Sequence, residues 1–119
     1  GLIPVGPDRW RALTLQALAD GCMDAGVVVR VVQLKDEARR DLADIKAHQA
    51  KIGRALDVLD RDERWLACGF HVGALALVCA IEWLIFREIL PDPLDGRPRL
   101  TQWYAANRER PALLSSRPG

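Results

Sequence analysis

Hydrophobic residues recur every three or four positions in the first third of the chain, which is the spacing of one face of a helix. They are Leu15, Leu18, Cys22, Ala25, Val29 and Val32. The pattern predicts a helix that begins near Asp8, a residue suited to the N-cap position just after Pro7. Gly21 and Gly26 lie inside this helix. Because each costs about 1 kcal/mol relative to alanine, they suggest close packing of another backbone or a bend.

A second stripe with the same spacing follows a short break around Lys35 and Asp36. Its members are Ala38, Leu42, Ile45, Gln49, Ile52, Leu56 and Leu59. Charged residues fill the other faces, so the stripe predicts an amphipathic helix that pairs antiparallel with the first. Gln49 is the polar member of the stripe, and it is either a buried hydrogen-bonding position or an edge residue.

The segment 69–86, GFHVGALALVCAIEWLIF, is apolar on nearly all sides. A membrane-spanning helix needs about 20 predominantly apolar residues. Only 15 residues separate His71 from Arg87, and Glu82 interrupts them. We therefore expect the segment to be the buried central helix of a bundle.

The last third of the chain opens with a loop rich in proline and predicts one more helix. This helix runs from Pro98 or Arg99 to Glu109 and has Leu100, Trp103 and Tyr104 on its apolar side, with Trp103 in the core. Residues after it read as an extended tail. No segment alternates with the period of a strand, so the expected fold is an all-α helical bundle in one domain.

Composition narrows the classes of function. The chain carries 17 basic and 16 acidic residues with no basic cluster, so we expect no nucleic-acid partner and no membrane surface. Cys22, Cys68 and Cys79 are odd in number and far apart, which is typical of reduced thiols in a cytoplasmic protein. With only His48 and His71 beside them, no metal site is expected. The opening residues lack the features of a signal peptide and read as a linker.

Four segments in this order resemble the all-helical C-terminal domain of the glutathione S-transferase superfamily, in particular its bacterial two-domain members. They are LIP followed by ALADGCMDA, then QAKIGRALDVLD, then GFHVGALALVCAIEWLIFR, and finally RPRLTQWYAANRERP followed by SSRP. The resemblance spans nearly the whole chain. It implies that residues 1–7 are the remnant of an interdomain linker and that residues 8–119 form the helical domain.

The start of the central helix departs from the family. There the family has a capping box, with Ser or Thr at the N-cap and Asp three residues later, whereas this chain has His71 and Ala74. A lost cap typically costs about 1 kcal/mol. Phe70 and Leu75 retain the hydrophobic staple across the cap. We expect a ring nitrogen of His71 to replace part of the missing cap.

The resemblance also implies a division of labour. In the family, an N-terminal thioredoxin-like domain holds glutathione and supplies the Ser, Cys or Tyr that stabilises its thiolate. This chain has no strand-helix-strand unit for such a residue, so we expect no catalytic residue, no cofactor and no activity in the chain alone. Glutathione would be the co-substrate of a full-length protein.

The helical domain would provide the wall of the pocket for a small hydrophobic electrophile. Trp10, Leu13 and Ala17 share one helix face and are the candidate wall residues. Trp10 could instead pack against the missing thioredoxin-like domain.

The family also predicts a homodimer, and Arg9, Asp20 and Asp24 are the candidate residues of a dimer or domain interface. The two carboxylates invite an acid-base or metal interpretation, but no histidine or third carboxylate lies in register with them. The alternative function is a non-catalytic protein-interaction module of the same fold, as in translation factors and aminoacyl-tRNA synthetases.

Overall fold

The structure is a computed structural model that describes residues 3–67 and 69–110 of the chain. Its elements are α1 (Pro7–Gln33), the 3-10 turn η1 (Glu37–Arg39), α2 (Leu42–Arg61), α3 (Arg64–Ala67), α4 (Val72–Phe86) and α5 (Pro98–Asn107). Within these ranges no residue forms a strand, which confirms the all-α prediction. The extended tail and the end of the chain that the sequence suggested lie outside the described residues.

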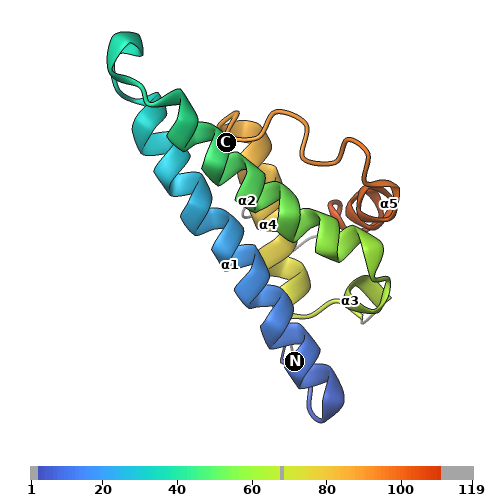
Figure 1. The fold of residues 1–119 in the computed structure, drawn as a ribbon. Helices are drawn as coiled ribbons and strands as arrows, with labels where there is room; N and C mark the ends of the chain where they lie inside the picture. Colours follow the sequence, from blue (N-terminus) through green and yellow to red (C-terminus); the bar gives the residue numbers. More distant parts are fainter. Residues whose placement is uncertain (1–2, 68, 111–119) are drawn as a thin grey trace.

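The long helices α1 and α2 run antiparallel, side by side, and α4 packs against α1 (Figure 1). The helix α5 lies to one side and makes its principal contact with α2. The core between these helices is built from fully buried aliphatic side chains. They include Leu15, Val29, Ile52, Leu56, Leu59, Leu77, Val78, Ile81, Leu84, Ile89 and Leu100.

The helix α1 begins at Pro7, one residue earlier than predicted, and its N-cap is Gly6 with φ 72° rather than Asp8. The fixed φ of proline suits the first helical position, and glycine tolerates the positive φ that precedes it. Asp8 lies in the first turn instead, where its charge complements the helix dipole. The predicted stripe is buried from Leu15 onward, except that Leu18 is half-buried against the core.

The helix α2 is shorter at its start than the hydrophobic stripe suggested. It begins at Leu42, and Asp41 caps it by accepting a hydrogen bond from the amide of Asp44 at 3.1 Å. Ala38 is exposed in η1, and Leu42 is 64% exposed, so these two members of the predicted stripe are not in the core. The stripe packs inward only from Ile45 onward, because α1 ends at Gln33 and the turn carries the chain past its end.

The apolar segment forms α4, a helix of 15 residues whose side chains fill the centre of the bundle, as expected. By length and composition alone, α1 rather than α4 is long and apolar enough to cross a membrane. A core helix passes the same test, and α1 lays its buried stripe along α4 and α2.

Glycine leaves room for a close contact between α1 and α4. A Cβ atom on Gly26 would lie 2.5 Å from Cζ3 of Trp83, so this glycine makes room for a side chain of α4 rather than for another backbone. Gly21 has nothing within 4 Å of the same position and makes no such contact.

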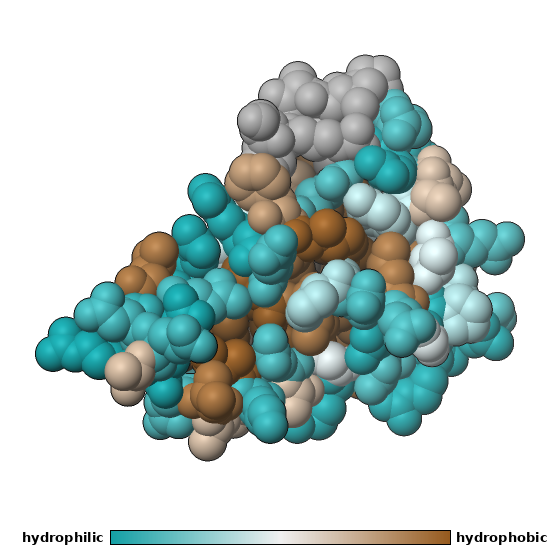
Figure 2. All heavy atoms as spheres, turned by 90° about the horizontal axis from the view of Figure 1, so that it is seen from above, coloured by the Kyte–Doolittle hydropathy of each residue, from teal (hydrophilic) through white to brown (hydrophobic). Residues whose placement is uncertain are grey.

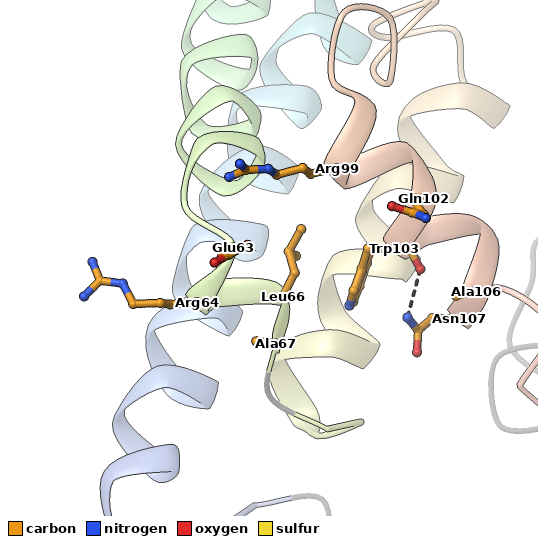
Figure 3. A pocket seen from close by; sticks show the side chains of 9 residues that line it. All are labelled: Glu63, Arg64, Leu66, Ala67, Arg99, Gln102, Trp103, Ala106 and Asn107. Atoms are coloured by element: carbon orange, nitrogen blue, oxygen red, sulfur yellow. Dashed lines mark hydrogen bonds between the residues drawn. The ribbon is translucent and has the colours of Figure 1, made fainter.

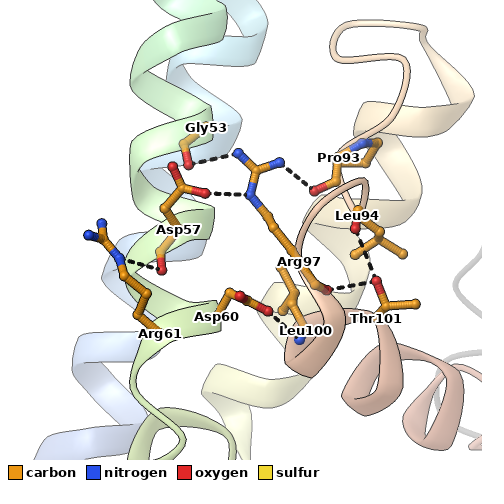
Figure 4. Close-up of polar contacts among 9 residues, drawn as sticks. All are labelled: Gly53, Asp57, Asp60, Arg61, Pro93, Leu94, Arg97, Leu100 and Thr101. Carbon is orange, nitrogen blue, oxygen red and sulfur yellow. Dashed lines mark hydrogen bonds and ion pairs between the residues drawn. The ribbon is translucent and has the colours of Figure 1, made fainter.

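Side chains of α2 hold the loop after α4 and the start of α5 (Figure 4). The guanidinium of Arg97 donates to Asp57 Oδ1 at 2.9 Å and to the backbone carbonyls of Gly53 at 3.1 Å and Pro93 at 2.9 Å. Asp60 accepts a hydrogen bond from the amide of Leu100 at 3.0 Å. These bonds fix the position of α5 on the end of α2.

Closer to the N-terminus of α2, Gln49 donates from Nε2 to the carbonyl of Ile89 at 2.8 Å. Gln49 is part-buried, so it is the hydrogen-bonding member of the stripe rather than an edge residue. The bond ties the loop after α4 back to the middle of α2.

Candidate functional site

The start of α4 is built around a buried histidine. His71 is the N-cap, and its Nδ1 accepts hydrogen bonds from the amides of Gly73 at 3.1 Å and Ala74 at 3.2 Å. The residue is 5% exposed. Burial lowers the pKa of His71, and the nearby Asp8 carboxylate acts in the opposite direction. Phe70 and Leu75 flank the cap, and both pack against the core.

The five candidate residues of the first helix follow one outer face of α1, opposite its buried stripe. Of the three proposed wall residues, Trp10 is 73% exposed, Ala17 is exposed and Leu13 is half-buried. Asp20 and Asp24 are exposed further along this face. The face is therefore open in the isolated chain and available for contacts with another surface.

Arg9, the sixth candidate, is exposed beside Trp10. The same face continues toward the end of α1 with apolar side chains. Val27 is 50% exposed, Val31 is 53% exposed and Leu34, just past the helix, is 68% exposed. Hydrophobic residues also show between hydrophilic ones where the molecule is viewed from above (Figure 2).

Trp10 lines a small cavity of about 160 Å³ between the start of α1 and the turn after α2. Its other walls are Arg11, Asp62, Arg64 and Trp65. The walls of this cavity do not include Leu13 or Ala17, so this cavity contains one of the three predicted wall residues.

The two charged residues on the far side of this cavity neutralise each other. Arg64 donates from Nη2 to Asp62 Oδ2 at 2.7 Å and from Nε to Asp62 Oδ1 at 2.9 Å. These hydrogen bonds hold the pKa of Asp62 at about 2 and raise the pKa of Arg64. The pair therefore acts as a fixed polar rim rather than as an acid or a base.

A larger open cavity of about 550 Å³ lies between α3 and α5 (Figure 3). Leu66 of α3 and Trp103 of α5 approach it from opposite sides. Arg99 reaches across from α5 and donates to the carbonyl of Arg61 at 3.0 Å. Asn107 donates to the carbonyl of Trp103 at 2.8 Å. Trp103 was expected in the core, but it is half-buried, packing against the core while lining this cavity.

The sequence did not reveal this cavity, because α3 is a single helical turn with no periodic pattern of its own. A signal for the smaller cavity was available in Trp65, a large aromatic residue within a run of charged residues. Such a residue is costly to leave in water and indicates a contact site or a cavity wall.

The Cys22 thiol offers little nucleophilic chemistry. Burial raises the pKa of the Cys22 thiol to about 11, so the reactive thiolate is scarce at neutral pH. Cys79 is half-buried in α4, and Cys68 lies outside the described residues. Within residues 3–67 and 69–110, no three His, Cys, Asp or Glu residues are grouped so that they could hold a metal ion.

Comparison with known proteins identifies relatives of this chain. The uncharacterized GST-like protein YibF of Escherichia coli (strain K12) is 32% identical in an alignment 108 residues long, and the match covers 85% of this chain and 52% of that protein. The chain thus spans about half the length of this curated relative. No family model matches the chain.

Solved structures give the same result with higher coverage of this chain. A glutathione transferase family member of Pseudomonas fluorescens Pf-5, with bound S-(propanoic acid)-glutathione, is 39% identical over 99% of this chain, with a TM-score of 0.90. The same relative with bound glutathione gives 0.89. A glutathione S-transferase of Methylobacillus flagellatus with bound glutathione is 27% identical over 99% of this chain, with a TM-score of 0.83. The chain covers 62%, 59% and 61% of these three structures.

The described residues are an all-helical domain in which α2 and α4 both pack against α1, and α5 lies against α2. The chain is similar over nearly its whole length to members of the glutathione S-transferase superfamily, and its fold is that of the all-helical C-terminal domain of this family.

Proposed function

We propose that this chain is the electrophile-side and dimerisation domain of a cytoplasmic glutathione S-transferase-like protein, with residues 1–7 as the linker and residues 8–119 as the domain. One observation carries the proposal: the chain matches 59–62% of structures that contain glutathione or a glutathione conjugate, while its described residues supply helices alone. Glutathione would then be bound by a thioredoxin-like half, and the chain alone would be inactive.

The outer face of α1 supports the proposed contacts. Trp10 offers a flat apolar surface for a hydrophobic electrophile, and its cavity with Trp65 is too small to enclose one without a second wall. Asp20 and Asp24 provide exposed charges that suit pairing with arginines such as Arg9 of a second copy. We propose a homodimer built on these charges.

A chimera tests the division of labour. In the Pseudomonas fluorescens relative, this chain would replace the segment that it matches. We expect the chimera to be retained on glutathione resin and to conjugate glutathione to a chlorinated dinitrobenzene, while the 119-residue chain does neither. Retention of the chain alone would refute the proposed division.

Variants of the chimera test the pocket contact and the dimer contact separately. Trp10→Ala is expected to raise KM for the electrophile, because it removes binding surface, while Val31→Ala on the same face serves as the matched control. Asp24→Arg is expected to shift the chimera toward the monomer in sedimentation. An unchanged KM would remove Trp10 from the pocket wall, and an unchanged mass would remove Asp24 from the interface.

The exposed apolar residues at the end of α1 favour the alternative function, a non-catalytic protein-interaction module, since apolar surface of this kind is typical of protein contacts. A chimera that folds but neither binds glutathione nor conjugates it would favour this module.

A further inference from the structure

The N-cap of α4 differs chemically from an ordinary cap. Ser, Thr, Asp and Asn present an oxygen that accepts hydrogen bonds at any pH near neutrality. His71 instead presents Nδ1, which accepts the amides of Gly73 and Ala74 only while its lone pair is free and any ring proton is on Nε2. Histidine is also the side chain whose charge normally changes between about pH 5 and 8.

Protonation of His71 would destabilise the fold in three ways. The ring would lose the acceptor for both amides, which belong to the group of first-turn amides without helical partners. It would place a positive charge at the positive end of the α4 dipole. It would also place that charge on a residue that is 5% exposed.

The charged groups around the ring do not offset this loss. The carboxylate of Asp8 on α1 favours the protonated ring. That carboxylate is also paired with Arg11, whose Nη1 lies 3.9 Å from Asp8 Oδ1, and the positive charge of Arg11 opposes its effect. From the far end of the chain, the guanidinium of Arg110 lies 4.5 Å from the ring centroid of Phe70, which precedes His71. The first turn of α4 contributes no acidic and no basic side chain.

The turn that His71 caps also forms part of the contact between α4 and α1. Gly73 lies directly against the backbone carbonyl of Ala12 and the side chain of Leu15. A frayed first turn of α4 would therefore loosen the packing on residues 12–15 of α1, in the half of that helix that carries Trp10 on its other side.

We propose that His71 is an acid-sensitive latch, in which protonation of the ring uncaps α4 and loosens its contact with residues 12–15 of α1. The latch is fully closed above the ordinary histidine pKa of about 6.5. Because burial disfavours the charged ring, stability is lost as the pH falls from there toward the lower pKa of the folded chain.

Amide hydrogen exchange of the full chain, measured by NMR at about pH 7.5 and about pH 5 and divided by the intrinsic rates, tests the latch. We expect the protection of the Gly73 and Ala74 amides to fall with acid by up to about tenfold for each unit by which the pKa of His71 is lowered. His71→Asn keeps a preferred cap that does not titrate, so its protection should stay nearly constant. His71→Ser is the second variant of this kind if the first fails to fold.

Two controls complete the test. His48, the other histidine of the chain, accompanies Asp44 on α2, and His48→Asn should retain the acid response of Gly73 and Ala74. An equal loss of protection in wild type and in the Asn or Ser variant would overturn the proposal. So would an NMR titration in which the ring of His71 has a pKa at or above its ordinary value.

Discussion

The contact between Gly73 and α1 allows a prediction whose sign depends on two opposed effects. In Gly73→Ala, the new Cβ would lie 2.9 Å from Cβ of Leu15, 3.1 Å from Cε1 of His71 and closer still to the carbonyl oxygen of Ala12. Carbon atoms in contact are ordinarily about 3.5–4.0 Å apart. The backbone of Ala12 cannot rotate away, so α4 and α1 must separate.

The two effects have known sizes. Replacing a helical glycine by alanine contributes about 0.5–1 kcal/mol of stability, whereas overpacking a filled interface costs about 1–3 kcal/mol. The clash with backbone favours the upper part of that range. We therefore expect Gly73→Ala to lower the free energy of unfolding by about 1–2 kcal/mol, or Tm by about 4–8 °C in a chain of this length.

Gly21→Ala is the matched control, because nothing lies within 4 Å of the Cβ position of Gly21. Only the gain from replacing a helical glycine by alanine remains at this position, so we expect Gly21→Ala to be more stable than wild type by about 0.5–1 kcal/mol. Urea unfolding followed by circular dichroism measures both variants. If Gly73→Ala proves as stable as wild type, or if both variants shift in the same direction, the close approach of α4 and α1 is refuted.

Three further predictions concern other parts of the fold. Arg97→Ala should lower the free energy of unfolding by about 1–3 kcal/mol, because the Arg97 side chain is 14% exposed and its removal leaves two backbone carbonyls without their hydrogen-bond donor. Denaturant unfolding measures this change, and a value near zero would contradict the prediction. Cys22 should resist a thiol reagent at about pH 8 in the folded chain and react after denaturation, since burial raises its pKa to about 11. Trp10→Ala in the isolated chain should change stability by less than about 0.5 kcal/mol, because the side chain is 73% exposed.

The sequence predicted the long helices well, because a stripe such as Leu15 to Val32 records which side of a helix meets the core. It predicted their ends less well. Ala38 continues the spacing of the second stripe but lies in η1, since spacing does not register a break between helices. Asp8 has the chemistry of a cap, yet the fixed φ of Pro7 moved the helix start by one residue.

The sequence predicted only those features of the candidate site that depend on the geometry of a single helix. Trp10, Leu13 and Ala17 share a face, as their spacing requires, but which residue meets a cavity depends on the turn after α2. The larger cavity arises where residues 63–67 approach residues 99–107, a contact between segments distant in the sequence. Gly21 and Gly26 show the same limit: they are identical in sequence terms, yet only Gly26 meets a neighbouring helix.

The way α5 is attached allows the larger cavity to change in evolution separately from the packing of the long helices. Arg97 and Asp60 suspend α5 from α2 by hydrogen bonds, and its principal contact is with α2. Two residues that line the larger cavity, Trp103 and Arg99, belong to α5. Selection could therefore remodel the cavity through α5 while the packing of the three long helices stays as it is.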